Sequence, residues 1–160
     1  MKTTDKYVFF WNGIYSNWHP SRIVYEDIHF ANSEQMFMYF KAWHFKDLES
    51  IDKIIVTTDP RKVKKLGREI KNFNEQEWAA HRLYYMFISC FNKFNQSPEL
   101  AKELLATGNK TIVEASPLDK IWGIGMDTNH PDIEDESKWQ GLNLLGKVLM
   151  DVRDMLKDTK

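Results

Sequence analysis

The sequence has a single cysteine, almost no net charge and no long apolar run. Cys90 stands alone among 160 residues, so an intramolecular disulfide is impossible and a reducing compartment is expected. Lys and Arg number 22 against 23 Asp and Glu, so no overall basic field attracts the chain to nucleic acid or membranes. No segment approaches the roughly 20 apolar residues of a membrane span, and no signal-peptide cleavage site follows the N-terminus. We therefore expect a cytoplasmic protein.

The composition is that of a globular domain. Hydrophobic residues make up 42% of the chain and aromatic residues 14%, which excludes a disordered tail, a collagen-like rod and a disulfide scaffold. The length suits one domain over residues 1–160, because domains commonly have about 100–150 residues.

Helix signals outnumber strand signals along the chain. Capping residues and helical spacing predict helices over about 33–47, 48–57, 61–71, 75–94, 98–107 and 141–157. Short β-prone runs predict strands over 7–11, 23–25, 28–30 and 111–115, with a hairpin turn at Glu26-Asp27. The expected fold class is α+β, a single compact and predominantly helical domain with a few short strands.

The first helix carries the most informative charges. Its apolar residues cover every direction of the helix, so we expect it to be enclosed on all sides. Glu34 and Lys41 lie on one face, about 10 Å apart and too far to pair directly. Glu34 could be a first-turn acid favoured by the helix dipole, with Lys41 reaching to water. It could also be a carboxylate in a cleft that handles protons or stabilises a cation.

A second group of candidates follows the last predicted strand. Glu114 ends the strand, Asp119 lies in a turn, and Trp122 stands next to Gly123. Glycine beside tryptophan allows a flat ligand to approach the backbone while the indole stacks on it. A core tryptophan beside an ordinary turn explains the same residues equally well.

The start of the last helix is a third candidate region. Asn143 could offer its amide to a ligand, and free N–H groups there could bind phosphate. A capping role for Asn143 is the alternative. Gly146, inside this helix, indicates close packing.

Other functional interpretations are weaker. The five histidines show no metal-ligand spacing, so no metal is expected. Cys90 lies on the apolar stripe predicted for residues 75–94, which favours a core position over a nucleophile. The basic run at 61–71 is interpreted as a solvated helix face, although it could contact phosphates.

Several motifs in a fixed order resemble the YbiA-like, or NADAR, family, whose name refers to NAD and ADP-ribose. They cover about residues 8–155. The matching segments are Phe10-Trp11-Asn12-Gly13, Tyr15-Ser16-Asn17-Trp18, Asn32-Ser33-Glu34-Gln35 with Met38 and Lys41-Ala42, Thr58-Asp59-Pro60, Leu66-Gly67-Arg68, Lys93-Phe94, Leu104 to Gly108, Val113 to Pro117 with Asp119, Ile121 to Gly125, and Trp139 to Gly146 with Leu149-Met150. Trp43-His44 replaces smaller residues common in the family, which would either narrow a pocket or repack a core.

The resemblance implies an α+β fold and N-glycosidase activity without a cofactor. The substrate would be a ribosylamino-pyrimidine phosphate of riboflavin synthesis or ADP-ribosylated guanine, free or in nucleic acid. Together with the residue chemistry, it assigns catalysis to acids, with Glu34 first, and substrate binding to polar and aromatic neighbours. The catalytic candidates are Glu34, Asp119 and Glu114. The substrate-binding candidates are Asn17, Trp18, Ser33, Lys41, Trp122, Gly123 and Asn143.

Two non-enzymatic alternatives remain open. The same residues could form a sensor that binds ADP-ribose or a related nucleotide without cleaving it. The chain could also be a partner-binding module that has no ligand pocket.

Overall fold

The computed structural model of the chain describes residues 1–159 and divides them into two compact units. The first unit joins residues 1–16 to the chain from Ser97 onward, and the second unit spans Asn17–Gln96. The predicted organisation as one domain over residues 1–160 stays a prediction. Each unit is described by itself.

The first unit is built on a three-stranded sheet with the order β1-β2-β5. The strands are β1 (Lys2–Thr3), β2 (Tyr7–Phe10) and β5 (Thr111–Glu114). β2 runs antiparallel to β1 and parallel to β5, with Phe10 opposite Glu114. The apolar residues of β2, the central strand, and of β5, at the edge, are mostly buried, which explains why these short β-prone runs form strands.

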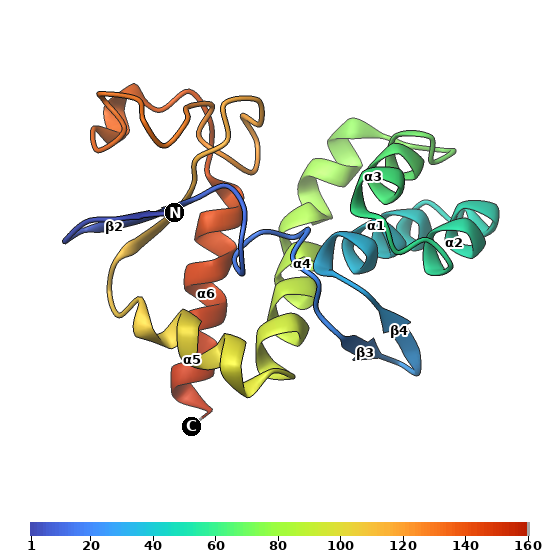
Figure 1. Cartoon of the computed structure of the whole chain (residues 1–160). Coiled ribbons are helices and arrows are strands. Elements are labelled where there is room, and N and C mark those ends of the chain that lie inside the picture. The colour runs from blue at the N-terminus through green and yellow to red at the C-terminus, as the bar shows by residue number, and fades with distance from the viewer. Residues whose placement is uncertain (160) are drawn as a thin grey trace. The chain divides into compact units, whose positions relative to one another are not determined.

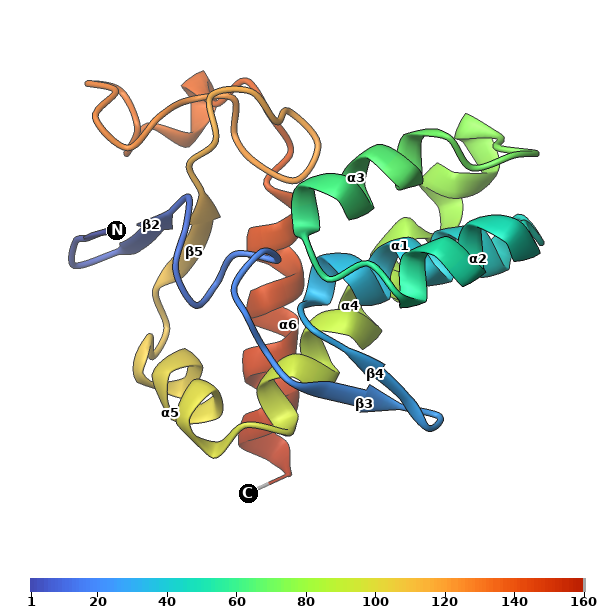
Figure 2. The same cartoon turned by 45° about the vertical axis from the view of Figure 1, so that its right-hand side comes forward.

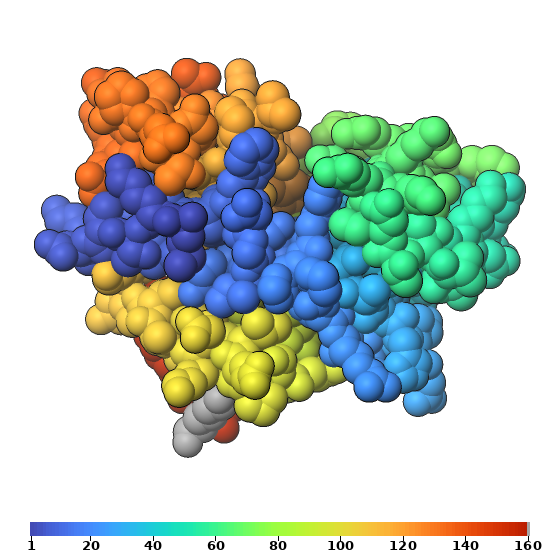
Figure 3. All heavy atoms as spheres, in the orientation of Figure 1, coloured from blue at the N-terminus to red at the C-terminus, as the bar shows by residue number. Residues whose placement is uncertain are grey.

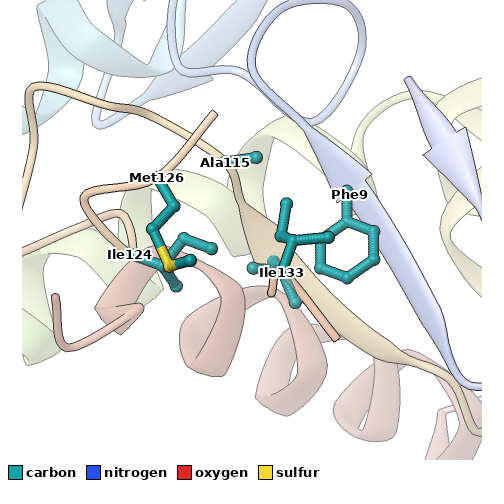
Figure 4. Packing of buried hydrophobic residues seen from close by; sticks show 6 residues of the cluster. Phe9, Ala115, Ile124, Met126 and Ile133 are labelled. Atoms are coloured by element: carbon teal, nitrogen blue, oxygen red, sulfur yellow. The ribbon is translucent and has the colours of Figure 1, made fainter. Parts of the chain in front are cut away.

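Two α-helices, a short 3-10 helix and a cluster of loops complete this unit (Figure 1). The helical segments are α5 (Pro98–Ala106), η1 (Glu136–Lys138) and α6 (Leu144–Asp158). α6 packs on β5 and α5. Figure 4 shows buried side chains from both strands and the loops gathered above α6. This cluster contains Phe9, Val113, Ala115, Ile124, Met126 and Ile133.

The second unit is helical, with one β-hairpin. Its elements are β3 (Ile23–Tyr25), β4 (Ile28–Phe30), α1 (Ser33–His44), α2 (Leu48–Ile55), α3 (Pro60–Arg68) and α4 (Glu75–Asn95). α1 packs against α2, α3 and α4, and the hairpin lies against these helices, with β3 contacting α4 and β4 contacting α1 and α2 (Figure 2). The side chains of Asn32, Asp47, Asp59 and Asn74 accept hydrogen bonds from backbone amides at the four helix starts. Local capping therefore sets these starts.

The predicted α+β, mostly helical fold class is confirmed, with differences at particular elements. β1 and η1 were not predicted, because two or three residues carry too weak a signal. α6 begins at Leu144 rather than Gly141, because Asn143 adopts a left-handed conformation with φ 52°. α1 is enclosed over most of its length, but Trp43 is 58% exposed. Trp43 therefore does not repack a core.

Burial in α4 also differs in part from the predicted stripe. Cys90 is buried as expected, whereas Leu83, another apolar residue at helical spacing in this segment, is exposed and Lys93 is only 2% exposed. Among residues 1–159, no helix has the length and apolarity needed to cross a membrane.

Candidate functional site

Glu34 lies in the first turn of α1 and is held by a neighbouring loop. The Glu34 backbone N–H donates to the Asn17 carbonyl at 3.1 Å. One residue earlier, the Ser33 hydroxyl donates to the Asn17 side-chain oxygen at 2.9 Å. Glu34 is 9% exposed, so its carboxylate lies at a largely enclosed helix start, where the helix dipole favours negative charge.

Asn17 is fixed from a second direction by α4. Its side-chain amide donates to the Met86 sulfur at 3.4 Å, and the Cys90 thiol donates to its oxygen at 3.8 Å. The predicted residues Asn17, Ser33 and Glu34 are therefore brought together. Cys90 supports this arrangement from the core.

Lys41 lies two turns along the same helix and contacts α3. Its ammonium donates to the Gly67 carbonyl at 2.9 Å and lies 4.6 Å from the ring centre of Phe73. Burial lowers the pKa of Lys41, while the carboxylates of Glu75 and then Glu34 partly offset this shift. Lys41 is thus a partly desolvated cation whose charge is stabilised by Glu75 and then by Glu34.

A cation beside Trp18 was not predicted. The Arg61 guanidinium lies 6.0 Å from the ring centre of Trp18, which is 38% exposed. Asp59 caps α3 and Pro60 starts it, so Arg61 lies in the first turn of the basic helix. α3 is at the surface of its unit (Figure 3), and this placement makes Arg61 a candidate for binding an anionic group near Trp18.

A buried lysine was also missed. Lys93 on α4 lies 5.1 Å from the ring centre of Phe94, and desolvation lowers its pKa to about 8. Burial and the charge of Lys93 lower the pKa of His19. Helical spacing from Cys90 places Lys93 near the apolar stripe. This spacing was the signal in the sequence from which the burial of Lys93 could have been predicted.

In the first unit, Asn143 holds the start of α6 against β5. Its side-chain oxygen accepts from the Glu114 backbone N–H at 3.0 Å, and its amide donates to the Ile112 carbonyl at 3.0 Å. Asn143 is 3% exposed and makes no side-chain cap of α6. Asn143 therefore stands at the N-cap position of α6 without the side-chain cap that was one of its two interpretations, because its side chain is bound to the strand.

Asp119 organises the turn that follows β5. One of its carboxylate oxygens accepts from the backbone N–H groups of Ile121 and Trp122, at 2.9 and 2.8 Å. The Asp119 N–H donates to the Ser116 hydroxyl at 3.2 Å. The turn thus fixes the backbone that carries Trp122.

Gly123 is required by the close approach of three backbone segments. A Cβ atom at this position would lie 2.9 Å from the Asp119 carbonyl and 3.0 Å from that of Glu114. Its own carbonyl accepts from the Asn143 N–H at 3.1 Å. The glycine therefore permits packing within the protein, which is a sufficient reason for its presence.

The amides at the start of α6 do not form a phosphate site as expected. The N–H groups of Leu144 and Leu145 donate to the carbonyls of Ile121 and Trp122, both at 3.1 Å. Together with the bond from Asn143 to Gly123, these contacts occupy the groups that would face an anion. The expectation is wrong because the turn after β5 folds back onto the helix start.

The predicted site residues fall into two groups, one in each unit. The group in the second unit contains Asn17, Trp18, Ser33, Glu34 and Lys41. The group in the first unit contains Glu114, Asp119, Trp122, Gly123 and Asn143.

Within residues 1–159 there is no group of three His, Cys, Asp or Glu side chains that could hold a metal ion.

Comparisons with known proteins agree over nearly the whole length. A family model described as the NADAR domain matches residues 4–157. N-glycosidase R617 of Acanthamoeba polyphaga mimivirus is 43% identical over 164 residues, covering 94% of this chain and 96% of that protein. Riboflavin biosynthesis protein VVA0006 of Vibrio vulnificus is 30% identical over 92% of this chain, which spans 36% of that protein.

A solved structure supports the fold. The NMR structure of the Escherichia coli protein YbiA matches with a TM-score of 0.80 and 25% sequence identity, covering 99% of this chain and 89% of that chain.

Proposed function

The chain belongs to the NADAR family and is an N-glycosidase, and we propose that Glu34 is its catalytic carboxylate. The observation that carries this assignment is the enclosed position of Glu34, 9% exposed, in the helix turn that Asn17 holds. Glu34 would act on the bond between a ribose C1′ and the nitrogen of a base-like ring.

Cleavage of this bond needs a negative group near the sugar. As the C1′–N bond breaks, positive charge develops at C1′ and the ring oxygen, while electrons move to the departing nitrogen. A carboxylate stabilises the cation or takes a proton from the attacking water. Both roles require the ionised form of the carboxylate.

The neighbours of Glu34 supply groups suited to a ribose phosphate. Asn17 and Ser33 fix the backbone at Glu34. Ser33 is fully buried and would act by holding Asn17, whereas the partly exposed Asn17 would offer polar atoms for ribose hydroxyls. Lys41 has three donors, one of which goes to Gly67, so it can also bind an anion. Trp18 would stack on the ring, and Arg61 beside it would bind phosphate.

The group in the first unit is assigned supporting roles. Asp119 is the second acid and Glu114 the third, for ribose hydroxyls or water. Trp122 would stack on a flat ring, and the buried Gly123 would act by allowing the close packing of the backbone that carries Trp122. Asn143 would act by holding Glu114 in place, because its amide already binds the strand.

We propose a ribosylated small molecule as the substrate, in a reaction located in the cytoplasm. The similarity to a riboflavin biosynthesis protein supports a ribosylamino-pyrimidine phosphate. An ADP-ribosylated guanine, free or in nucleic acid, is the second candidate, supported by the basic helix α3 and the Arg61–Trp18 contact.

Replacing Glu34 by glutamine tests the catalytic assignment, because size and polarity remain while the charge is lost. We expect kcat to fall about 10²–10⁴-fold with an unchanged melting temperature. Glu99→Gln is the matched control, since Glu99 is an exposed first-turn acid of another helix. Turnover by folded Glu34→Gln at the parent rate would remove Glu34 from the mechanism.

Product analysis tests the substrate and the sensor alternative together. The protein is incubated separately with ADP-ribosylated guanine DNA and with the ribosylamino-pyrimidine phosphate, and the products are identified by mass spectrometry. Release of the base from one of them identifies the substrate. A rise in melting temperature without cleavage of either would instead support a nucleotide sensor.

A further inference from the structure

The second unit contains a cavity walled by aromatic side chains, in which Glu34 has no part. Its volume is about 210 Å³, below the roughly 300–1,000 Å³ typical of drug-sized ligand sites. The cavity lies among the β3–β4 hairpin, α1 and α4. Its principal lining residues are Tyr25, Glu26, Tyr39, Phe40, Trp43 and Tyr84.

The floor and the walls of this cavity differ in burial. Phe40 and Tyr85 are buried and stack with ring centres 5.3 Å apart, which gives a rigid floor. Tyr25 packs edge-on against Phe40, with ring centres at 5.4 Å. Trp43 and Tyr84 are 58% and 64% exposed. Large aromatic side chains left in water around a hollow mark a binding surface.

The single charged residue among the lining residues is an acid at a strained turn. Glu26 has φ 48° and its neighbour Asp27 has φ 64°. Positive φ at both central residues is the two-residue hairpin turn that follows strand twist, although it usually contains Asn or Gly. The turn connects Tyr25 to Ile28 and places Glu26 beside the aromatic walls.

The electrostatics of the cavity favour a cation. Burial and then the Glu26 carboxylate raise the pKa of both Tyr25 and Tyr39. Both tyrosines are therefore neutral near pH 7, and the negative charge of Glu26 acts on both of these wall residues. Aromatic faces carry negative electrostatic potential, so the aromatic walls and the Glu26 carboxylate both favour a cation.

We propose that this aromatic cavity binds the head group of a small quaternary ammonium compound. Several aromatic faces around one charged centre, with an acid at the rim, are the chemistry that recognises methylated ammonium groups. The small volume fits a head group rather than a nucleotide. This site is independent of the N-glycosidase reaction.

Choline and its neutral carbon isostere, in which a tert-butyl group replaces trimethylammonium, test the proposal. Both are titrated into the full chain and followed by broadening of their methyl NMR signals. We expect saturable choline binding at least about 10-fold tighter than that of the isostere, because only choline carries charge. Equal affinities would indicate a purely apolar groove and overturn the proposal, as would the absence of choline binding.

Two variants with matched controls locate the binding. Glu26→Gln should weaken choline binding at least about 3-fold, whereas Asp27→Asn, the same charge change at the next turn residue, should leave it unchanged. Trp43→Leu should weaken binding about 10-fold, whereas Trp11→Leu, at another exposed tryptophan, should not. The melting temperature of each variant verifies its folding. Unchanged choline affinity in folded Glu26→Gln and Trp43→Leu would place binding elsewhere and refute the assignment.

Discussion

The Ser33 hydroxyl donates a hydrogen bond to the Asn17 side-chain oxygen across 2.9 Å. A parallel backbone bond joins Glu34 to the Asn17 carbonyl. The two bonds join a loop to the first turn of α1, so the position of the Glu34 backbone depends on a residue far from it in sequence. The position of the proposed catalytic acid therefore depends on tertiary contacts as well as on the helix.

Replacing Ser33 by alanine tests this relationship. The variant removes one buried donor and leaves the Asn17 oxygen with a weak thiol donor, so we expect a loss of about 1–2 kcal/mol in the free energy of unfolding. We also expect a lower kcat/KM, because Glu34 is less well fixed. Urea unfolding and steady-state kinetics measure the two effects.

Ser137→Ala is the control for this loss. Ser137 also donates a hydrogen bond through its hydroxyl, at 2.6 Å, but it is exposed. Its replacement should change stability by less than about 0.5 kcal/mol. Equal effects of the two substitutions would contradict a special role for the Ser33–Asn17 bond.

Gly146→Ala should destabilise the first unit, contrary to helix propensity. Propensity alone predicts a gain of about 1 kcal/mol from alanine in a helix. However, a Cβ atom at Gly146 would overlap the Ile112 carbonyl and the Asn143 amide. We expect a net loss of about 1–3 kcal/mol, measured by chemical denaturation, with Lys147→Ala, an exposed neighbour on α6, changing little. A stabilised Gly146→Ala protein would show that α6 can move away from β5.

Lys93 should make the stability of the protein rise with pH in the alkaline range. Desolvation lowers its folded-state pKa to about 8, against 10.5 for an exposed lysine. Between these values the unfolded chain binds more protons than the folded chain, so raising the pH favours folding. The gain over the whole window is about 3 kcal/mol, since one pKa unit corresponds to about 1.4 kcal/mol.

The measurement compares wild type with Lys93→Met by urea unfolding at several pH values from 7 to 10. The difference between the two pH profiles isolates Lys93, because the buried tyrosines contribute to both. Wild type should gain stability relative to the variant as the pH rises above about 8. Parallel profiles would mean that Lys93 is hydrated in solution.

Local signals predicted most of the helical starts, because capping acts within a few residues. Asn32, Asp59, Asn74 and Ser97 each precede a helix, and each accepts the amide bond typical of a cap. The Glu26-Asp27 turn was also predicted, because the signal for a hairpin turn likewise lies within a few residues. The start of α6 was predicted three residues too early, because the left-handed Asn143 is held by β5 rather than by its neighbours.

The helix-rich α+β class, the family and the candidate acids could all be predicted from the sequence, because caps, periodicity and motif order are properties of short segments. Which polar groups remain available to a ligand depends instead on the tertiary structure. It engages the Asn143 amide with β5, buries Lys93 beside Phe94 and places Arg61 near Trp18. These outcomes depend on which segments pack together, and contacts between residues distant in the chain leave no local pattern.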